Sequence, residues 1–293
     1  MCYNVVNLRG IRSVFMGKTL YLTDLDGTFL HPDAKIGDTS KSIINRLSKE
    51  GVLFSISTAR TYATVIPMFH GIDLRCPLIL MNGVCIYDPQ AKKTLIHHKI
   101  DIEDGKEVER IFLKHGKNPM LYFENSDNLR VEYKWLENDP QRIYVSARDG
   151  FYHKGFAQVD QYSYSGKGDL IYAVTLDRPE EIDQLHQELC GIKGIDWNYY
   201  PDTYTGCYFL EGMKAGISKA SGAKQVQKLV GADKIVAFGD NRNDIPLFEA
   251  ADEAYAVGNA CDDLKRIATG VIDSCETDAV ARFLLHRFEN GTI

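Results

Sequence analysis

The stretch that decides the fold is LYLTDLDGTFL, residues 20–30. Apolar residues typical of a buried strand run directly into two aspartates, Asp24 and Asp26, which Gly27 and Thr28 follow. Two neighbouring carboxylates are costly to bury, because each loses its water and the like charges repel. Taken alone, the stretch is also compatible with a solvated turn. Its meaning therefore depends on what else the chain brings to the end of this strand.

The bulk composition excludes several classes of protein. The chain has 293 residues, of which 44% are hydrophobic and 25% charged, as in ordinary globular proteins. The net charge of −6 argues against a general attraction to nucleic acid or anionic membranes. The seven cysteines are scattered without CxxC spacing, which predicts reduced thiols rather than a zinc site.

Targeting signals are also missing from the sequence pattern. No apolar run is long enough for a membrane span, and residues 1–16 lack the continuous apolar region of a signal peptide. We expect these residues to form a disordered N-terminal extension. The chain is expected to be cytoplasmic and a monomer or small homo-oligomer, with no nucleic-acid or membrane partner.

Strand and helix patterns alternate at both ends of the chain. Short apolar strands are predicted at 19–24, 52–58, 77–83 and 234–240, with helices between and after them. Such alternation predicts an α/β fold with a Rossmann-like, doubly wound parallel sheet covered by helices on both faces. We assign residues 17–86 and 209–293 to this core.

The middle of the chain has a different character. Residues 87–208 combine many aromatics, a few strand-like runs and a long polar stretch at 146–169 that is predicted to be a loop. This pattern predicts an inserted α+β domain. Its aromatics Tyr133, Trp135, Tyr199 and Tyr200 could stack on a substrate ring, although aromatics also favour half-buried sheet positions. Polar side chains of the predicted loop that could reach a substrate are Arg148, His153 and Lys154.

Polar residues follow each core strand at its carboxyl end. Ligands bind beyond this edge of an open parallel sheet. Besides Asp24 and Asp26, the sets are Thr58, Ala59 and Arg60 after the second strand, Asp240, Asn243 and Asp244 after a later one, and Lys219 at the start of a helix. Each alone has an ordinary reading as a turn, a cap or a surface lysine. Their shared position predicts one site.

The residue types at this edge suit phosphoryl transfer. Several carboxylates with room for water favour Mg²⁺, which would be shared with a phosphate group. A threonine hydroxyl at a helix N-terminus and a lysine would hold the phosphate. Asp24 is then the candidate nucleophile, forming an aspartyl-phosphate, and Asp26 the candidate general acid and base.

The same residues carry a resemblance to a known family. DLDGT, STAR, GISKASGAKQV and GDNRNDIPLFEAA, followed by AYAVGNACDDLK, resemble the motifs of the haloacid dehalogenase-like hydrolases, and most of all the Cof-type branch with its type IIB cap. The resemblance implies a phosphatase whose inserted cap closes over the core site. It departs from the branch at Ala59, where a glycine is usual. We expect no loss of activity from the extra methyl group.

The resemblance also assigns roles to residues. It implies catalytic Asp24 and Asp26, and a metal site formed by Asp24, Asp26, Asp240 and Asp244. In that site Mg²⁺ is held by Asp24, the backbone carbonyl of Asp26 and Asp240, and Asp244 is the supporting acidic residue. The residues implied to bind the substrate phosphate are Thr58, Ala59, Lys219 and Asn243.

The expected activity is a Mg²⁺-dependent phosphatase acting on small phosphomonoesters. Candidate substrates are sugar phosphates and cofactor phosphates such as pyridoxal phosphate or flavin mononucleotide. Two alternatives stay open at this point, because a fold does not fix a function. One is a phosphomutase of the same fold, and the other is a non-catalytic sensor that binds a phosphorylated ligand.

Overall fold

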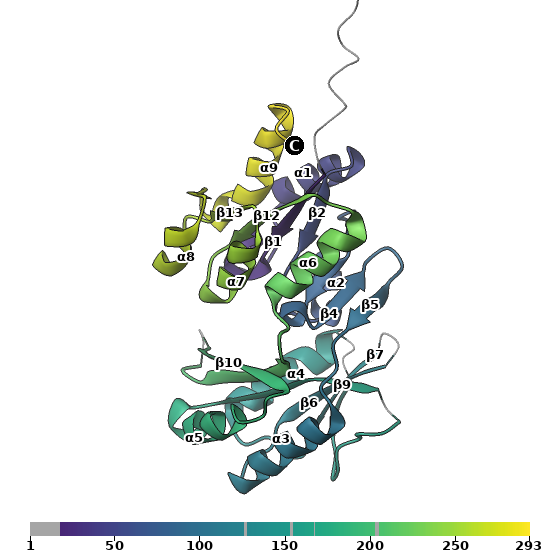
Figure 1. Cartoon of the computed structure of the whole chain (residues 1–293), viewed down its shortest axis with the longest axis vertical. Coiled ribbons are helices and arrows are strands. Elements are labelled where there is room, and N and C mark those ends of the chain that lie inside the picture. Colours follow the sequence, from purple (N-terminus) through teal and green to yellow (C-terminus); the bar gives the residue numbers. More distant parts are fainter. Residues whose placement is uncertain (1–17, 126–127, 153–154, 167, 203–204) are drawn as a thin grey trace, which may run out of the picture.

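The computed structural model describes residues 18–293 except 126–127, 153–154, 167 and 203–204. The expected N-terminal extension, and His153 and Lys154 of the expected loop, lie outside the described residues. The described chain forms two units stacked along the long axis of the molecule (Figure 1). It passes from the first unit to the second after residue 98 and returns before residue 219.

The first unit contains a five-stranded parallel sheet in the order β14-β13-β12-β1-β2. Its strands are β1 (Thr19–Thr23), β2 (Leu53–Ile56), β12 (Lys234–Gly239), β13 (Glu253–Ala256) and β14 (Gly270–Val271). From β1 the chain moves to β2 on one side, whereas from β12 it moves to β13 and β14 on the other. The direction of winding therefore reverses between β1 and β12, which is where such sheets bind ligands.

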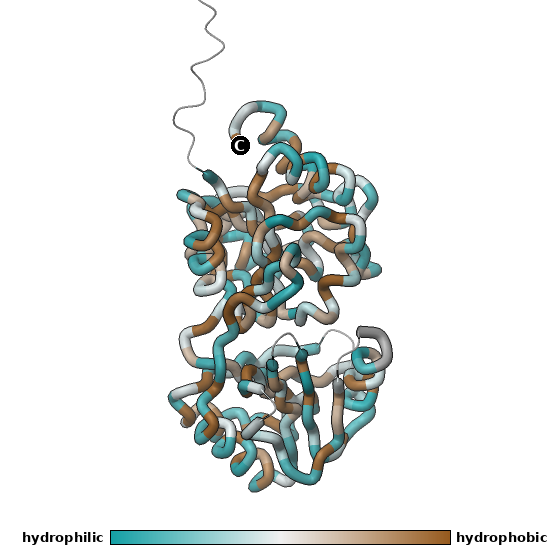
Figure 2. The backbone as a smooth tube through the Cα atoms, turned by 90° about the vertical axis from the view of Figure 1, so that its right-hand side faces the viewer, coloured by the Kyte–Doolittle hydropathy of each residue, from teal (hydrophilic) through white to brown (hydrophobic). Residues whose placement is uncertain are grey.

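Helices cover both faces of this sheet. They are α1 (Asp38–Lys49), α2 (Tyr62–Met68), α6 (Lys219–Val230), α7 (Ile245–Ala250), α8 (Asp262–Ile267) and α9 (Ala279–Glu289). Helix α1 packs beside α9, and α6 packs beside α7. Right-handed crossovers in opposite directions place α1 and α7 on opposite faces. The predicted doubly wound α/β fold is confirmed, and Figure 2 shows apolar segments running through the middle of this unit.

A three-stranded antiparallel sheet extends the first unit towards the second. It consists of β3 (Leu78–Leu80), β4 (Cys85–Asp88) and β5 (Lys93–His97) in that order. Strands β4 and β5 form an antiparallel hairpin. A parallel bridge between Ser57 and Ile79 joins β3 to the end of β2.

The second unit is built on a six-stranded sheet in the order β10-β11-β9-β6-β7-β8. The strands are β6 (Met120–Asn125), β7 (Asn128–Tyr133), β8 (Gly155–Gln158), β9 (Asp169–Asp177), β10 (Ile195–Pro201) and β11 (Tyr208–Lys214). Helices α3 (Ile102–Lys114) and α5 (Pro179–Leu189) pack on one face, against Leu121 and Phe123 of β6. The expected separate α+β unit is present and lies beside the core (Figure 1).

The sequence predicts that the inserted unit begins after residue 86 and ends at residue 208. Strand pairing suggests other limits. Strands β4 and β5 pair with β3 of the first unit, whereas β11 pairs with β9 and β10 of the second. We therefore propose that the inserted unit runs from about residue 100 to about residue 215, since hydrogen-bonded strands belong to one sheet.

The first part of the stretch expected to be a loop at 146–169 is helical instead, and Gly155–Gln158 of the same stretch form β8. Helix α4 (Asp139–Tyr152) lies between the second sheet and the core, in contact with β9 and α2. Gln141 donates to the carbonyl of Leu176 at 3.1 Å, and Asn138 accepts from the backbone N–H of Gln141 at 2.8 Å. These contacts stabilise a helix that its polar composition did not predict. Among the described residues, no helix combines the length and apolar character that a membrane crossing requires.

Candidate active site

The candidate site lies at the point where the winding of the sheet reverses. Strands β1 and β12 are parallel neighbours, and Asp24 and Asp240 are the residues that directly follow them. The backbone N–H of Asp24 donates to the carbonyl of Phe238 at 3.0 Å, so the pairing continues to the first carboxylate. The sheet thus brings together two aspartates that lie more than two hundred positions apart in the sequence.

A tight turn over Leu25–Phe29 follows Asp24 and closes around Asp240. Gly27 has a φ of +74°, and a Cβ atom built on it would lie 2.4 Å from Oδ2 of Asp240. Only glycine suits this position, because of both the left-handed backbone and the close approach. Thr28 donates its hydroxyl to Oδ1 of Asp240 at 2.9 Å. The DLDGT motif therefore positions the third aspartate of the site as well as its own two.

Lys219 is the central cation of the site. It begins α6, its side chain is only 1% exposed, and its Nζ donates to Oδ1 of Asp24 and to Oδ1 of Asp244 at 2.7 Å each. Burial alone would lower the pKa of Lys219, but the two carboxylates outweigh this effect and raise it. The lysine is therefore a fixed positive charge beside Asp24.

Asp244 uses both of its oxygens to organise the neighbouring groups. Oδ1 binds Lys219, while Oδ2 accepts from the backbone N–H groups of Asp240 and Asn241 at 3.1 and 3.2 Å. The side chain is fully buried. Asp244 therefore holds Lys219 and the backbone that follows β12 in place.

The three carboxylates form a group that could hold a metal ion. One oxygen from each of Asp24, Asp240 and Asp244 lies within 4.8 Å of the others. Burial, followed by the neighbouring charge of Asp244, raises the pKa of Asp240 to about 6. Burial also raises the pKa of Asp24, although Lys219 counteracts part of that effect. When these carboxylates are ionised, nearby cations do not balance all of their negative charge. A cluster of oxygen donors of this kind fits a hard divalent cation such as Mg²⁺.

Asp26 does not belong to this group of three carboxylates and is paired with an arginine. Its side chain is 54% exposed and accepts two hydrogen bonds from Arg60, from Nε at 2.7 Å and from Nη2 at 2.6 Å. Arg60 belongs to the STAR motif, whose Thr58 is buried and accepts from the backbone N–H of Arg60 at 3.2 Å. The motif thus supplies a partner for Asp26, a contact that the sequence reasoning did not predict.

The other predicted phosphate-binding residues lie at the edge of the site. Ala59 is exposed between Thr58 and Arg60, and Asn243 is exposed on the short turn over Arg242–Asp244. Asn259, which was not predicted, donates to the carbonyl of Gly27 at 2.7 Å and accepts from the N–H of Cys275 at 3.0 Å. It fastens the DLDGT turn to a later loop. The only sequence feature that could have indicated Asn259 is the Gly-Asn pair in the AYAVGN motif.

A cavity of about 470 Å³ opens between the two units in front of Asp26. The core lines it with Asp26, Ala59, Arg60, Thr61 and Thr64, and the second unit with Tyr144, Ala147, Arg148, Tyr200, Phe209 and Glu211. Arg148 and Tyr200 had been singled out from the sequence. Tyr199 lies on the opposite sheet face and bonds to Asp183 instead. The sequence does not predict Phe209 and Glu211 as cavity residues, because the expected core begins at residue 209.

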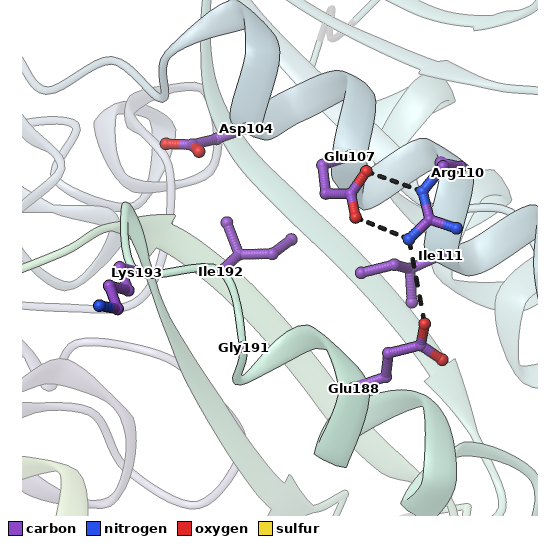
Figure 3. Close-up of a pocket in the computed structure, with 8 residues that line it drawn as sticks. All are labelled: Asp104, Glu107, Arg110, Ile111, Glu188, Gly191, Ile192 and Lys193. Carbon is purple, nitrogen blue, oxygen red and sulfur yellow. Dashed lines mark hydrogen bonds and ion pairs between the residues drawn. The ribbon is translucent and has the colours of Figure 1, made fainter.

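A second cavity lies between α3 and α5 (Figure 3), and none of the residues that line it belongs to the candidate site. Its most prominent charged side chains are paired with one another. Arg110 makes two hydrogen bonds to Glu107, at 2.7 and 2.6 Å, and also faces Glu188 at 4.0 Å. These pairs neutralise the charges, so we do not regard this cavity as a candidate active site.

Comparisons with known proteins agree with this geometry. The model of the haloacid dehalogenase-like hydrolase family matches residues 21–284. The chain is 26% identical to the 5-amino-6-(5-phospho-D-ribitylamino)uracil phosphatase YitU of Bacillus subtilis, over 92% of this chain and 97% of that protein. It is also 26% identical to the pyridoxal phosphate phosphatase YbhA of Escherichia coli, over 89% of this chain and 95% of that protein.

A solved structure shows the same fold. A haloacid dehalogenase-like hydrolase from Bacteroides thetaiotaomicron superimposes with a TM-score of 0.75 at 18% identity, covering 92% of this chain and 99% of that one. The match includes the sheet, the winding reversal and the inserted unit, because it extends over nearly all of both chains. The chain belongs to the haloacid dehalogenase-like hydrolases.

Proposed function

We propose that the protein is a Mg²⁺-dependent phosphatase that hydrolyses small phosphorylated metabolites through an aspartyl-phosphate on Asp24. The observation that carries this proposal is the buried Lys219, which bridges Asp24 and Asp244 at 2.7 Å beside Asp240. A buried cation between two carboxylates at a ligand-binding strand end fits a site that must hold an anionic group next to an anionic nucleophile.

The residues take the following roles in the proposed reaction. A carboxylate oxygen of Asp24 attacks phosphorus, and the bond from phosphorus to the ester oxygen of the substrate breaks. Asp26 gives a proton to the departing oxygen, and then takes one from the water that attacks the aspartyl-phosphate. That water releases inorganic phosphate and restores the Asp24 carboxylate.

Other groups of the site hold the phosphate and the metal. Thr58, Ala59, Lys219 and Asn243 would bind the phosphate oxygens. Side chains of Asp24 and Asp240 and the carbonyl of Asp26 would hold Mg²⁺, with Asp244 supporting Lys219 and the backbone around Asp240. When bound, Mg²⁺ would offset the repulsion between the carboxylate and the phosphate.

The relatives support the class of substrate. The names of YitU and YbhA describe phosphatases of 5-amino-6-(5-phospho-D-ribitylamino)uracil and of pyridoxal phosphate. Both are small phosphomonoesters, which agrees with a cavity of about 470 Å³ beside Asp26. Sugar phosphates and cofactor phosphates are therefore the substrates to test.

The test measures phosphate release from a panel of glucose 6-phosphate, ribose 5-phosphate, pyridoxal 5′-phosphate, flavin mononucleotide and the generic ester p-nitrophenyl phosphate. Each is assayed with Mg²⁺ and with EDTA, for the unchanged protein and for Asp24→Asn. We expect release that needs both Mg²⁺ and Asp24. The variant Asp33→Asn, at an exposed aspartate paired with Lys35, is the matched control and keeps full activity. Equal turnover by Asp24→Asn would contradict the proposal.

A further inference from the structure

The second unit contributes a set of side chains that the phosphate chemistry does not use. Phe209 and Glu211 are two positions apart on β11 and therefore lie on the same sheet face. Tyr200 of β10 is the ladder partner of Phe209 and shares that face. Tyr144 and Arg148 lie one helical turn apart on α4. All five line the cavity opposite Asp26, and we call them the cap subsite.

The aromatic members of the cap subsite are held in fixed positions. The ring centroid of Phe209 lies 5.9 Å from that of Tyr144 and 5.6 Å from that of Tyr200. The Tyr144 hydroxyl is 2.6 Å from that of the buried Tyr122. Three fixed rings give this end of the cavity flat, mainly apolar walls, which suit a flat ring better than a puckered one.

Glu211 is the unusual member, because it is a buried carboxylate with incomplete hydrogen bonding. It is 8% exposed, and among the described residues its Oε2 has no hydrogen-bond partner. Burial raises the pKa of Glu211, while the nearby hydroxyls of Tyr172 and Tyr200 and the Arg148 guanidinium counteract part of that effect. A buried carboxylate with an unpaired oxygen is costly, so a ligand in the cavity that donates a hydrogen bond to the Glu211 carboxylate would be favoured.

The remaining polar groups around the cavity are mostly engaged with the protein. Arg60 binds Asp26, and Thr64 donates to the carbonyl of Thr61 at 2.8 Å. Arg148 lies 3.7 Å above the Tyr144 ring centroid and donates to the Tyr144 carbonyl at 3.2 Å. A hexose would bury several hydroxyl groups here with few partners, whereas a flat ring needs only one or two polar contacts.

We propose that the cap subsite recognises a flat nitrogen-heteroaromatic ring, whose ring N–H or amino group donates a hydrogen bond to Glu211 while the ring packs against Phe209, Tyr144 and Tyr200. This inference rests on the proposed phosphatase function and narrows its substrates to heteroaromatic phosphomonoesters. The phosphate of the bound substrate would point towards Asp24 and Asp26, and the ring towards the second unit.

The first test removes the acceptor. Glu211→Leu replaces the carboxylate with an apolar side chain of similar size, whereas Glu211→Gln keeps an oxygen acceptor but removes the charge. We expect Glu211→Leu to raise KM for the nitrogen-heteroaromatic members of the panel about tenfold or more, with a smaller rise for Glu211→Gln. Turnover of p-nitrophenyl phosphate, which has a ring but no N–H donor, should fall clearly less than turnover of the heteroaromatic members, because Glu211→Leu removes no hydrogen bond to this substrate.

The second test uses neighbouring tyrosines on one strand. Tyr200→Leu removes a ring from the cavity, whereas Tyr199→Leu removes one from the opposite face of the same sheet. We expect Tyr200→Leu to raise KM for the heteroaromatic substrates and Tyr199→Leu to leave it unchanged.

Two results separate this inference from the phosphatase proposal. The inference is overturned if the unchanged protein hydrolyses hexose phosphates more efficiently than the heteroaromatic members, or if Glu211→Leu slows all substrates equally.

If no panel member is hydrolysed, the phosphatase proposal fails instead. Calorimetric binding of the heteroaromatic phosphates to Asp24→Asn then tests the subsite without turnover. Weaker binding in the Asp24→Asn, Glu211→Leu double variant supports it, and equal or absent binding overturns it.

Discussion

Arg60 holds Asp26 with two parallel hydrogen bonds, 2.7 and 2.6 Å long, at the mouth of the cavity between the two units. Such a bidentate contact between a guanidinium and a carboxylate fixes the orientation of the carboxylate and also pairs its charge. Asp26 is otherwise 54% exposed, so this arginine is the main constraint on a side chain proposed to transfer a proton. The orientation of the proposed acid and base is therefore set by the STAR motif.

We predict that Arg60→Ala lowers kcat by about tenfold, because a mobile Asp26 spends less time within reach of the leaving oxygen. The matched control is Arg75→Ala, which breaks another partly exposed arginine–aspartate pair, to Asp73 at 2.7 Å, outside the site. Steady-state kinetics on p-nitrophenyl phosphate measure both. An unchanged kcat in Arg60→Ala would show that Asp26 does not need its partner.

Lys219→Met should both destabilise the protein and abolish turnover. The change leaves Asp24 and Asp244 buried without their cation, which typically costs about 3–5 kcal/mol. Lys117→Met is the control, since Lys117 is also largely buried and binds Asp177 at 2.7 Å and Glu137 at 3.2 Å in the second unit. Urea denaturation should show a loss of stability in both variants. Activity measured well below the denaturation midpoint should be lost only in Lys219→Met.

Asp240 should make the metal-free protein less stable as the pH rises. Its folded pKa of about 6 lies above its ordinary 3.8, so the folded state binds the proton more tightly than the unfolded state does. This contribution is fully present below about pH 4 and is lost as the pH rises through 6, by up to about 3 kcal/mol. Denaturation in EDTA at pH 4.5 and pH 7.5 measures the change.

Two comparisons assign this pH dependence to Asp240. Asp240→Asn should reduce it, because the amide does not titrate. Mg²⁺ should raise the stability of the unchanged protein at pH 7.5, where the carboxylate is ionised, but not that of Asp240→Asn. The assignment to Asp240 would fail if the variant kept the full pH dependence.

Gly27→Ala should disturb the metal site beyond its effect on the backbone. A Cβ at this position would lie 2.4 Å from Oδ2 of Asp240, and the alanine would also have to adopt the φ of +74° that Gly27 has. Gly231→Ala is the control, because Gly231 has a φ of +64° with nothing within 4 Å of the added Cβ. Both changes should cost about 1–2 kcal/mol in stability. Only Gly27→Ala should also raise the Mg²⁺ concentration needed for half-maximal activity.

Ala59→Gly restores the residue that is usual in the Cof-type branch. Because Ala59 is exposed at the cavity wall, we predict that kcat/KM on p-nitrophenyl phosphate changes by less than about twofold, as for surface substitutions in general. A large gain in activity would show that the methyl group obstructs the phosphate.

Local sequence was sufficient to predict the groups that meet at the strand ends. Asp24, Thr58 and Asp240 each follow an apolar strand, and parallel strands bring their carboxyl ends to one edge. The hydrophobic periodicity predicted α1, whose Ile43, Ile44 and Leu47 are buried on one side. These features depend on residues close together in the chain, so a single sequence contains the information.

The tertiary structure alone decided how distant side chains pair. The contact of Arg60 with Asp26, the double anchoring by Asp244 and the position of Glu211 in the cavity depend on backbone turns and strand pairing that no local pattern specifies. Helix α4 forms through contacts with a sheet assembled from remote segments. The sequence by itself thus determined the core fold and its candidate reacting groups, whereas packing between the two units decided which side chains line the cavity between them.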